Sequence, residues 1–139
     1  MLFGRVTYEL MASYWPTASA KADDPRIIAA MNDFPKVIFS RTLEKVEWKN
    51  SRLVKSDAAE EVRELKQRQG KDLVIYGSGG LVSALAGKGL IDDYRMLVAP
   101  VVLGEGIPMF RGLGGRLGLR LVQVKSFATG AVLLRYEPL

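Results

Sequence analysis

Cysteine and histidine are both absent from the 139 residues of this chain. The lack of cysteine excludes disulfide bonds, thiolate catalysis and thiolate metal ligands. The lack of histidine removes the usual general base and the commonest transition-metal ligand, and with them serine–histidine hydrolysis. Acid–base chemistry must therefore use Asp, Glu, Tyr, Lys or water, and we predict no metal site.

Long apolar runs are absent as well. No run approaches the roughly 18 residues that suggest a membrane span, and the N-terminus lacks the basic and apolar segments of a secretory signal. These features, with the lack of cysteine, favour a cytoplasmic protein. Apolar residues make up 48% and charged residues 25% of the chain, a globular composition. We expect a single domain over residues 1–139.

Positive charge is in excess, but it is not concentrated. The net charge is +5, and the 20 Lys and Arg residues are scattered, without a run of five. A nucleic-acid-binding protein is thus an alternative that no recognisable motif supports, and we predict neither a nucleic-acid nor a membrane partner. A modest positive charge suits an anionic small ligand equally well, or solubility alone.

Strand-like apolar runs alternate with segments of helical periodicity. We expect strands at residues 1–3, 36–39, 73–76, 94–102, 119–127 and 131–136, and helices at 7–14, 26–31, 58–69 and 81–86. Asp57 is the expected N-cap of the third helix, and Trp48 is expected to pack on the core. The pattern predicts an α/β domain whose mostly parallel sheet is flanked by helices and carries a C-terminal antiparallel hairpin.

Three of these strands run into small, glycine-rich or basic clusters. The clusters are Gly4-Arg5-Val6-Thr7, Ser40-Arg41-Thr42 and Gly77-Ser78-Gly79-Gly80-Leu81. Ligands of open parallel sheets bind outside the carboxyl ends of the strands. Three such ends suited to phosphate predict one extended anionic ligand, such as a phosphorylated dinucleotide.

The glycine cluster is the strongest of these signals. Glycines between a strand and a helix let backbone N–H groups approach a phosphate, and the helix N-terminus adds favourable partial charge. Residues 77–80 match neither GxGxxG nor a P-loop, so nucleoside triphosphate hydrolysis is not expected. A tight turn without a ligand stays an alternative.

The two basic clusters have similar alternatives. Arg5 and Arg41 each offer a bidentate fork to phosphate, and Arg41 can pair with the 2′-phosphate that distinguishes NADP from NAD. In the alternative, Thr7 caps a helix beside a solvated Arg5, and residues 40–42 form a polar turn.

One carboxylate is a candidate catalytic group. Glu105 lies between Gly104 and Gly106, on a flexible segment that can face a ligand. The alternative is a solvent-exposed turn. The neighbouring pair Asp92-Asp93 is interpreted as a structural corner between a helix and a strand.

The order of the segments resembles the dihydrofolate reductase superfamily, in particular the branch with the reductase domain of the riboflavin-biosynthesis deaminase–reductase. The matching segments are residues 3–9, 14–16, 40–43, 75–81, 90–95, 100–106 and 127–136. The resemblance implies an NADPH-dependent reductase, homodimeric, that transfers hydride to a pyrimidine- or pterin-like substrate. Protonation would come from water or Glu105.

The resemblance also implies the cofactor contacts. The first turn would contribute Gly4, Arg5 and Thr7, the adenosine-phosphate turn Ser40, Arg41 and Thr42, and the pyrophosphate turn Gly77, Ser78, Gly79, Gly80 and Leu81. Family members usually begin with a further strand that bears a Ser-Leu-Asp-Gly-type segment, whereas this chain opens at what resembles their second strand. A non-catalytic nucleotide-binding module of the same fold is therefore the alternative function.

Overall fold

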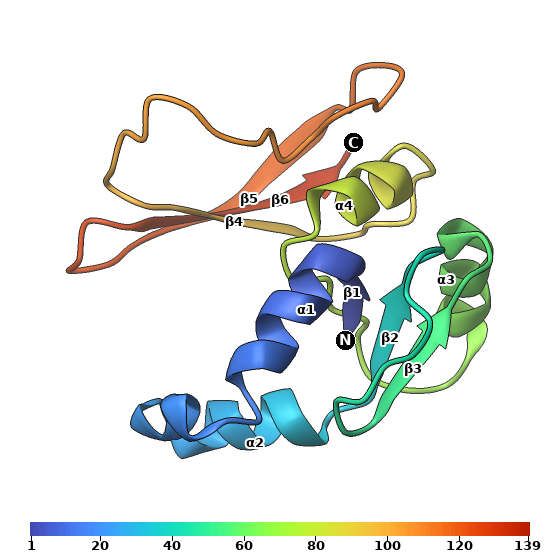
Figure 1. The fold of residues 1–139 in the computed structure, drawn as a ribbon. Helices are drawn as coiled ribbons and strands as arrows, with labels where there is room; N and C mark the ends of the chain where they lie inside the picture. Colours follow the sequence, from blue (N-terminus) through green and yellow to red (C-terminus); the bar gives the residue numbers. More distant parts are fainter.

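Two three-stranded sheets organise the computed structural model, which describes residues 1–139 (Figure 1). The strands are β1 (Leu2–Gly4), β2 (Lys36–Phe39), β3 (Ser51–Val54), β4 (Tyr94–Val98), β5 (Leu119–Ser126) and β6 (Val132–Pro138). The helices are α1 (Arg5–Tyr14), η1 (Ala18–Ala22, a 3₁₀ helix), α2 (Pro25–Asp33), α3 (Ala58–Gln67) and α4 (Gly79–Ala86). The predicted α/β class, with helices and a C-terminal antiparallel hairpin, is confirmed.

The N-terminal sheet is parallel, in the order β1-β2-β3. Leu2 lies opposite Val37, which lies opposite Arg52. The run at 73–76 extends this sheet beyond β1, but only through a bridge between Leu2 and Ile75 and a 2.7 Å hydrogen bond from the Leu2 N–H to the Val74 carbonyl. The expected strand at 73–76 is therefore reduced to one bridge.

Strand β3 was not expected from the sequence. Its polar residues Ser51 and Arg52 hide the strand pattern, and β3 lies at the edge of its sheet, where one side of the strand meets solvent. The predicted strand at 94–102 ends early, at Val98, since Pro100 lacks the amide needed to continue the ladder.

Both faces of the parallel sheet are covered. Side chains alternate along β1, so that Leu2 and Phe3 point to opposite faces. One face packs on α3 and α4 through Leu2, Val37, Val54, Ala59, Val62, Leu81 and Leu85. The other packs on α1 and α2 through Phe3, Tyr8, Met31, Ile38 and Trp48, which confirms the expected role of Trp48 in the core.

Two acidic caps define the starts of α2 and α3. The Asp24 carboxylate accepts the amide of Arg26 at 2.8 Å. The Asp57 carboxylate accepts the amides of Ala59 at 2.8 Å and Glu60 at 3.1 Å, which confirms the predicted cap. These amide bonds hold the pKa of Asp57 below its usual range. None of the helices has the length and apolar character needed to cross a lipid bilayer.

The C-terminal sheet is antiparallel, in the order β4-β6-β5, and lies apart from the parallel sheet (Figure 1). Its β5–β6 hairpin turns at residues 128–130, as expected, and the Phe127 amide donates to the Ala131 carbonyl at 2.9 Å. Every residue of β5 after Leu119 is exposed. This half of the molecule therefore lacks the cover that the parallel half has.

Candidate functional site

The register of the parallel sheet brings the three predicted turns together at the carboxyl-terminal end of its strands. The pairing of Leu2 with Ile75 places Gly4 level with Gly77, and Gly4 itself lies opposite Phe39, the residue before Ser40. The first and third turns touch directly, since the Gly4 amide donates to the Ser78 hydroxyl at 2.9 Å. Parallel pairing thus gathers segments that lie far apart in the sequence.

The glycine turn has an unusual backbone. Gly77 (φ +54°) and Ser78 (φ +58°) both lie in the left-handed region. Glycine adopts this conformation without strain, whereas a serine there carries a cost of order 1–3 kcal/mol. The bond from Gly4 to the Ser78 hydroxyl offsets part of this cost and locks the two turns together.

Two helix N-termini meet at this contact. Helix α1 follows Gly4 and α4 follows Ser78, and neither has a side-chain cap or an acidic residue in its first turn. The amides of Gly79, Gly80 and Leu81 donate to no acceptor of the protein. Unpaired backbone amides and the positive end of the helix dipole both favour the binding of an anion at a helix N-terminus.

The glycines of the turn face different surroundings. A Cβ built on Gly79 would lie 3.1 Å from the Met109 carbonyl oxygen, so a side chain there would force the chain at 108–109 to shift by a few tenths of an ångström. A Cβ on Gly80 would meet nothing within 4 Å. Gly80 therefore marks the open side of the turn, where a ligand can approach the backbone.

Exposed cations surround this edge. Arg5 forms a loose pair with Glu9 at 3.7 Å, with both side chains about half exposed. Arg41 is exposed and forms no hydrogen bond or ion pair with another side chain. Both arginines are thus free to turn toward an anionic ligand.

A fourth strand end of this sheet, which is basic, was not predicted from the sequence. Lys55 directly follows β3, and the pairing of Phe39 with Val54 places it beside Ser40. The sequence does contain a pattern that indicates this strand end. Leu53 and Val54 are apolar and are followed by the basic Lys55, as the apolar runs before Arg5 and Arg41 are followed by a basic cluster. It was overlooked because β3 was not recognised as a strand.

Other predicted site residues have structural contacts. The Ser40 hydroxyl accepts the amides of Thr42 at 3.2 Å and Leu43 at 3.1 Å, so it shapes its own turn. Leu81 is 8% exposed and belongs to the core, which leaves only its backbone for a ligand. Thr7 does not cap α1, since the cap position is Gly4.

Glu105 is not joined to the glycine turn. It is exposed and makes no hydrogen bond or ion pair, and it lies on the stretch between β4 and β5. The turn instead approaches the same stretch four residues further on, at Met109.

The two aspartates before β4 are structural, as expected. Asp92 pairs with Lys66 at 2.5 Å. Asp93 accepts hydrogen bonds from Arg95 at 2.9 Å and from Arg135 at 3.0 Å. Burial raises the pKa of Asp93, but the bonds from the two arginines outweigh it, and the pKa lies below its usual range.

A groove of about 650 Å³ runs alongside the site, between the two sheets. Residues 73–75 and Gly77 form one wall, and Tyr94, Arg95 and Met96 of β4 form another. Gly77 therefore connects the glycine turn with this groove.

The sequence of the chain matches a known protein family. The model of the RibD C-terminal domain matches residues 1–133, and the chain belongs to this family. The resemblance to the riboflavin-biosynthesis reductase domain is thereby confirmed.

Two relatives come from Bacillus subtilis (strain 168). The uncharacterized protein YyaP is 31% identical over 137 residues, which are 99% of this chain and 72% of YyaP. The uncharacterized protein YwjB is 42% identical over 72 residues, which are 52% of this chain and 41% of YwjB. The chain thus spans only part of the length of each relative.

Solved structures share the fold. A putative riboflavin biosynthesis protein from Shewanella sp. PV-4 superposes with a TM-score of 0.77 at 22% identity, over 99% of this chain and 72% of that one. A diaminohydroxyphosphoribosylaminopyrimidine deaminase/5-amino-6-(5-phosphoribosylamino)uracil reductase from Thermotoga maritima gives a TM-score of 0.63 at 16% identity, over 99% of this chain and 44% of that one.

Proposed function

We propose that the protein is an NADPH-dependent reductase of the riboflavin-biosynthesis type. The observation that carries the proposal is the junction of two uncapped helix N-termini through Gly4 and Ser78, at a sheet edge rimmed by cations. Membership in the RibD C-terminal domain family supports a reductase. The Thermotoga neighbour is named as a 5-amino-6-(5-phosphoribosylamino)uracil reductase, which supports a pyrimidine-like substrate. A pterin-like compound is the other substrate class that the superfamily resemblance implies.

The residues present fit this cofactor. The free amides of Gly79 and Gly80 suit the pyrophosphate, on the side where a Cβ of Gly80 would meet nothing. Arg41 and Lys55, which lie just beyond the ends of the paired strands β2 and β3, suit the 2′-phosphate that distinguishes NADPH from NADH. When bound, NADPH supplies a hydride.

The remaining chemistry falls to residues of the chain and to solvent. The glycine turn orients the cofactor, with Gly77 directing it toward the groove. Water or Glu105 delivers the proton to the substrate, because the chain has no histidine. A cytoplasmic location is part of the same proposal.

The second candidate is a nucleotide-binding module without catalysis. It is favoured by the exposed position of Glu105, which makes no hydrogen bond or ion pair with the turn. Both candidates require cofactor binding, and reductase activity toward a pyrimidine substrate distinguishes them.

Calorimetric titration with NADPH and NADH tests the cofactor. We expect tighter binding of NADPH, and Arg41→Ala should reduce the difference between the two by about 1–3 kcal/mol, the scale of a hydrogen bond to a charged group. Lys125→Ala, on β5, is the matched control and should leave the preference unchanged. Equal affinities for the two cofactors in the wild-type chain, or no binding, would contradict the proposal.

Substitution of Gly80 tests the pyrophosphate site. Gly80→Val places a branched side chain where the phosphate must approach, so we expect NADPH to bind at least tenfold more weakly. Gly70→Val is the matched control, because a Cβ there also meets nothing within 4 Å. Gly79→Val is less informative, since it also meets the Met109 carbonyl. Normal binding by Gly80→Val would show that the turn is purely structural.

We also propose that the protein is a homodimer in which the apolar face of the C-terminal sheet is covered. Cross-strand register aligns apolar residues on this face: Tyr94, Met96 and Val98 of β4, Val132, Leu134 and Tyr136 of β6, and Leu121 and Val124 of β5. Val98, Leu121 and Val124 are each 51–56% exposed in the single chain. Contiguous exposed apolar surface of this kind marks interaction sites, and two-fold dimers are the commonest oligomers.

A further inference from the structure

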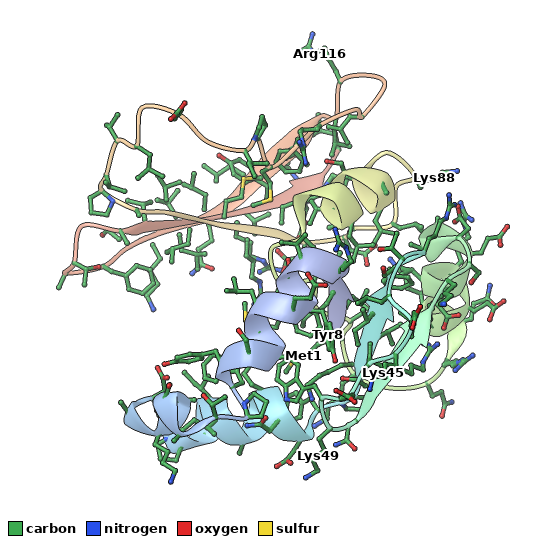
Figure 2. The ribbon with its side chains drawn as sticks, viewed as in Figure 1. Met1, Tyr8, Lys45, Lys49, Lys88 and Arg116 are labelled. Atoms are coloured by element: carbon green, nitrogen blue, oxygen red, sulfur yellow. The ribbon has the colours of Figure 1, made fainter.

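The stretch at residues 99–118, between β4 and β5, is weakly attached to the rest of the protein. It contains no helix or strand, and Arg116 projects outward from it (Figure 2). Its most exposed large apolar residues are Val101, Val102, Leu103 and Ile107, which are 61–95% exposed. Such a segment needs a specific anchor to hold one conformation.

Ser83 provides that anchor. Its hydroxyl donates to the Met109 carbonyl at 3.3 Å and accepts the Arg111 amide at 2.9 Å. The other backbone hydrogen bonds of the stretch are a local one, from the Val101 amide to the Ala99 carbonyl, and one at its end, from the Leu139 amide to the Gly118 carbonyl. Between these two points, Ser83 makes the only hydrogen bonds from the stretch to the rest of the chain. Ser83 is 6% exposed, so both of its bonds are shielded from water.

The same helix forms the glycine turn. Gly79 lies four residues before Ser83, on the same face of α4, and its missing side chain lets the backbone at 108–109 approach. The amides of Gly79 and Gly80 open at the N-terminus of that helix. Helix α4 thus carries both the proposed cofactor-binding turn, at its N-terminus, and Ser83, to which the stretch at 99–118 is hydrogen-bonded.

We propose that Ser83 is a positioning residue, which fixes the stretch at 99–118, with Glu105, relative to a ligand on the glycine turn. The proposal rests on the proposed function for the identity of that ligand, NADPH. Ser83 touches neither cofactor nor substrate and acts through Met109 and Arg111. Ligand binding at the glycine turn reduces the motion of α4. The hydrogen bonds of Ser83 to Met109 and Arg111 transmit this restriction to the stretch at 99–118.

Amide hydrogen exchange, resolved by residue with NMR, tests the anchor. In the unliganded wild-type chain, the Arg111 amide should exchange at least tenfold more slowly than the amides of Gly106 and Gly112, which have no acceptor. Ser83→Ala should remove this protection, and Ser83→Thr, which keeps a hydroxyl, should restore it. Ser126→Ala, at an exposed serine of β5, is the matched control.

Saturating NADPH tests the coupling. We expect NADPH to slow exchange at residues 103–111 at least threefold in the wild-type chain and to leave it unchanged in Ser83→Ala, although that variant retains the glycine turn and binds NADPH. The affinity of Ser83→Ala for NADPH should stay within about threefold of wild type.

The outcomes separate this inference from the proposed function. An unprotected Arg111 amide in the wild-type chain overturns the anchor, and this result does not depend on any variant folding. NADPH binding without slower exchange at 103–111 overturns the coupling while the proposed function stands. Failure of the wild-type chain to bind NADPH overturns the proposed function and the coupling, and the Arg111 protection then still decides the anchor.

Discussion

The two halves of the molecule use their sheets differently. The parallel half buries Phe3 and Ile38 completely and covers both of its faces with helices. The antiparallel half leaves Leu121 and Val124 of its apolar face 51% and 56% exposed. Folding of one chain therefore buries the apolar faces of the parallel half but leaves the apolar face of the antiparallel half exposed, which is typical of an interaction site.

The two halves also differ in how their polar side chains are bonded. In the parallel half, Lys36 is 1% exposed, and its ammonium donates to three carbonyls at 2.9 Å, those of Asn32, Phe34 and Lys49. It also lies 4.4 Å from the ring centre of Trp48. Burial, reinforced by Lys49, lowers the pKa of Lys36 although Asp33 opposes the shift. A charge is tolerated there because every donor has a partner.

Tyr8 closes the same region from α1. Its hydroxyl accepts the amides of Glu47 at 3.0 Å and Trp48 at 3.3 Å, so that α1 and the loop that leads to β3 are joined (Figure 2). In the antiparallel half the polar contacts are mostly surface ion pairs, such as Arg120 with Glu137 at 2.9 Å. Surface pairs of this kind contribute little stability, which leaves the parallel half as the stable core.

The largest expected difference between the two halves is in the loss of unfolding free energy when one apolar side chain of each half is truncated. Ile38→Ala should lower the free energy of unfolding by about 2–5 kcal/mol, because Ile38 is fully buried. Leu97→Ala should change it by less than about 0.5 kcal/mol, since Leu97 lies on the mixed polar face of its sheet. Urea denaturation measures both. Similar losses would show that both halves are equally covered.

A charge on the apolar face tests the proposed dimer. By light scattering at micromolar concentration, the wild-type chain should have twice the 15.3 kDa mass of one chain. Leu121→Asp should weaken association at least a hundredfold, about 2.7 kcal/mol, because a carboxylate would be buried without a partner. Gln123→Asp, on the opposite face of β5, is the control and should remain dimeric. A wild-type mass near that of one chain would contradict the dimer.

The smallest expected effect is that of the ion cluster on the open sheet. Asp93→Asn should lower the free energy of unfolding by about 1 kcal/mol at neutral pH, because the carboxylate links Arg95 and Arg135. The folded state lowers the pKa of Asp93. Its contribution is therefore complete above the unfolded pKa, about 3.9, and is lost as the pH falls through the folded pKa.

Thermal unfolding of wild type and Asp93→Asn between pH 3 and pH 7 checks this prediction. The difference in stability should shrink below about pH 4, where the wild-type carboxyl becomes protonated. A difference that stays constant with pH would show that Asp93 acts by packing or by neutral hydrogen bonds.

The sequence was sufficient wherever a local pattern carries the structure. Apolar periodicity predicted the helices, and Asp57 predicted a cap. Binding of a ligand at the three glycine-rich or basic strand ends stays a prediction. Helices and caps depend on interactions between residues a few positions apart, so the local sequence determines them. The order of the same segments was also enough to indicate the family.

Only the tertiary structure decided how distant segments meet. Strand β3, and with it Lys55, was hidden because an edge strand with polar residues has no clear pattern. The strand expected at 73–76 fell to a single bridge because strand pairing depends on partners far along the chain. The backbone of Met109 packs closely against Gly79, and Ser83 is hydrogen-bonded to Met109, which lies 26 residues away in sequence. Such contacts leave no local trace, since they are fixed by the packing of the whole chain.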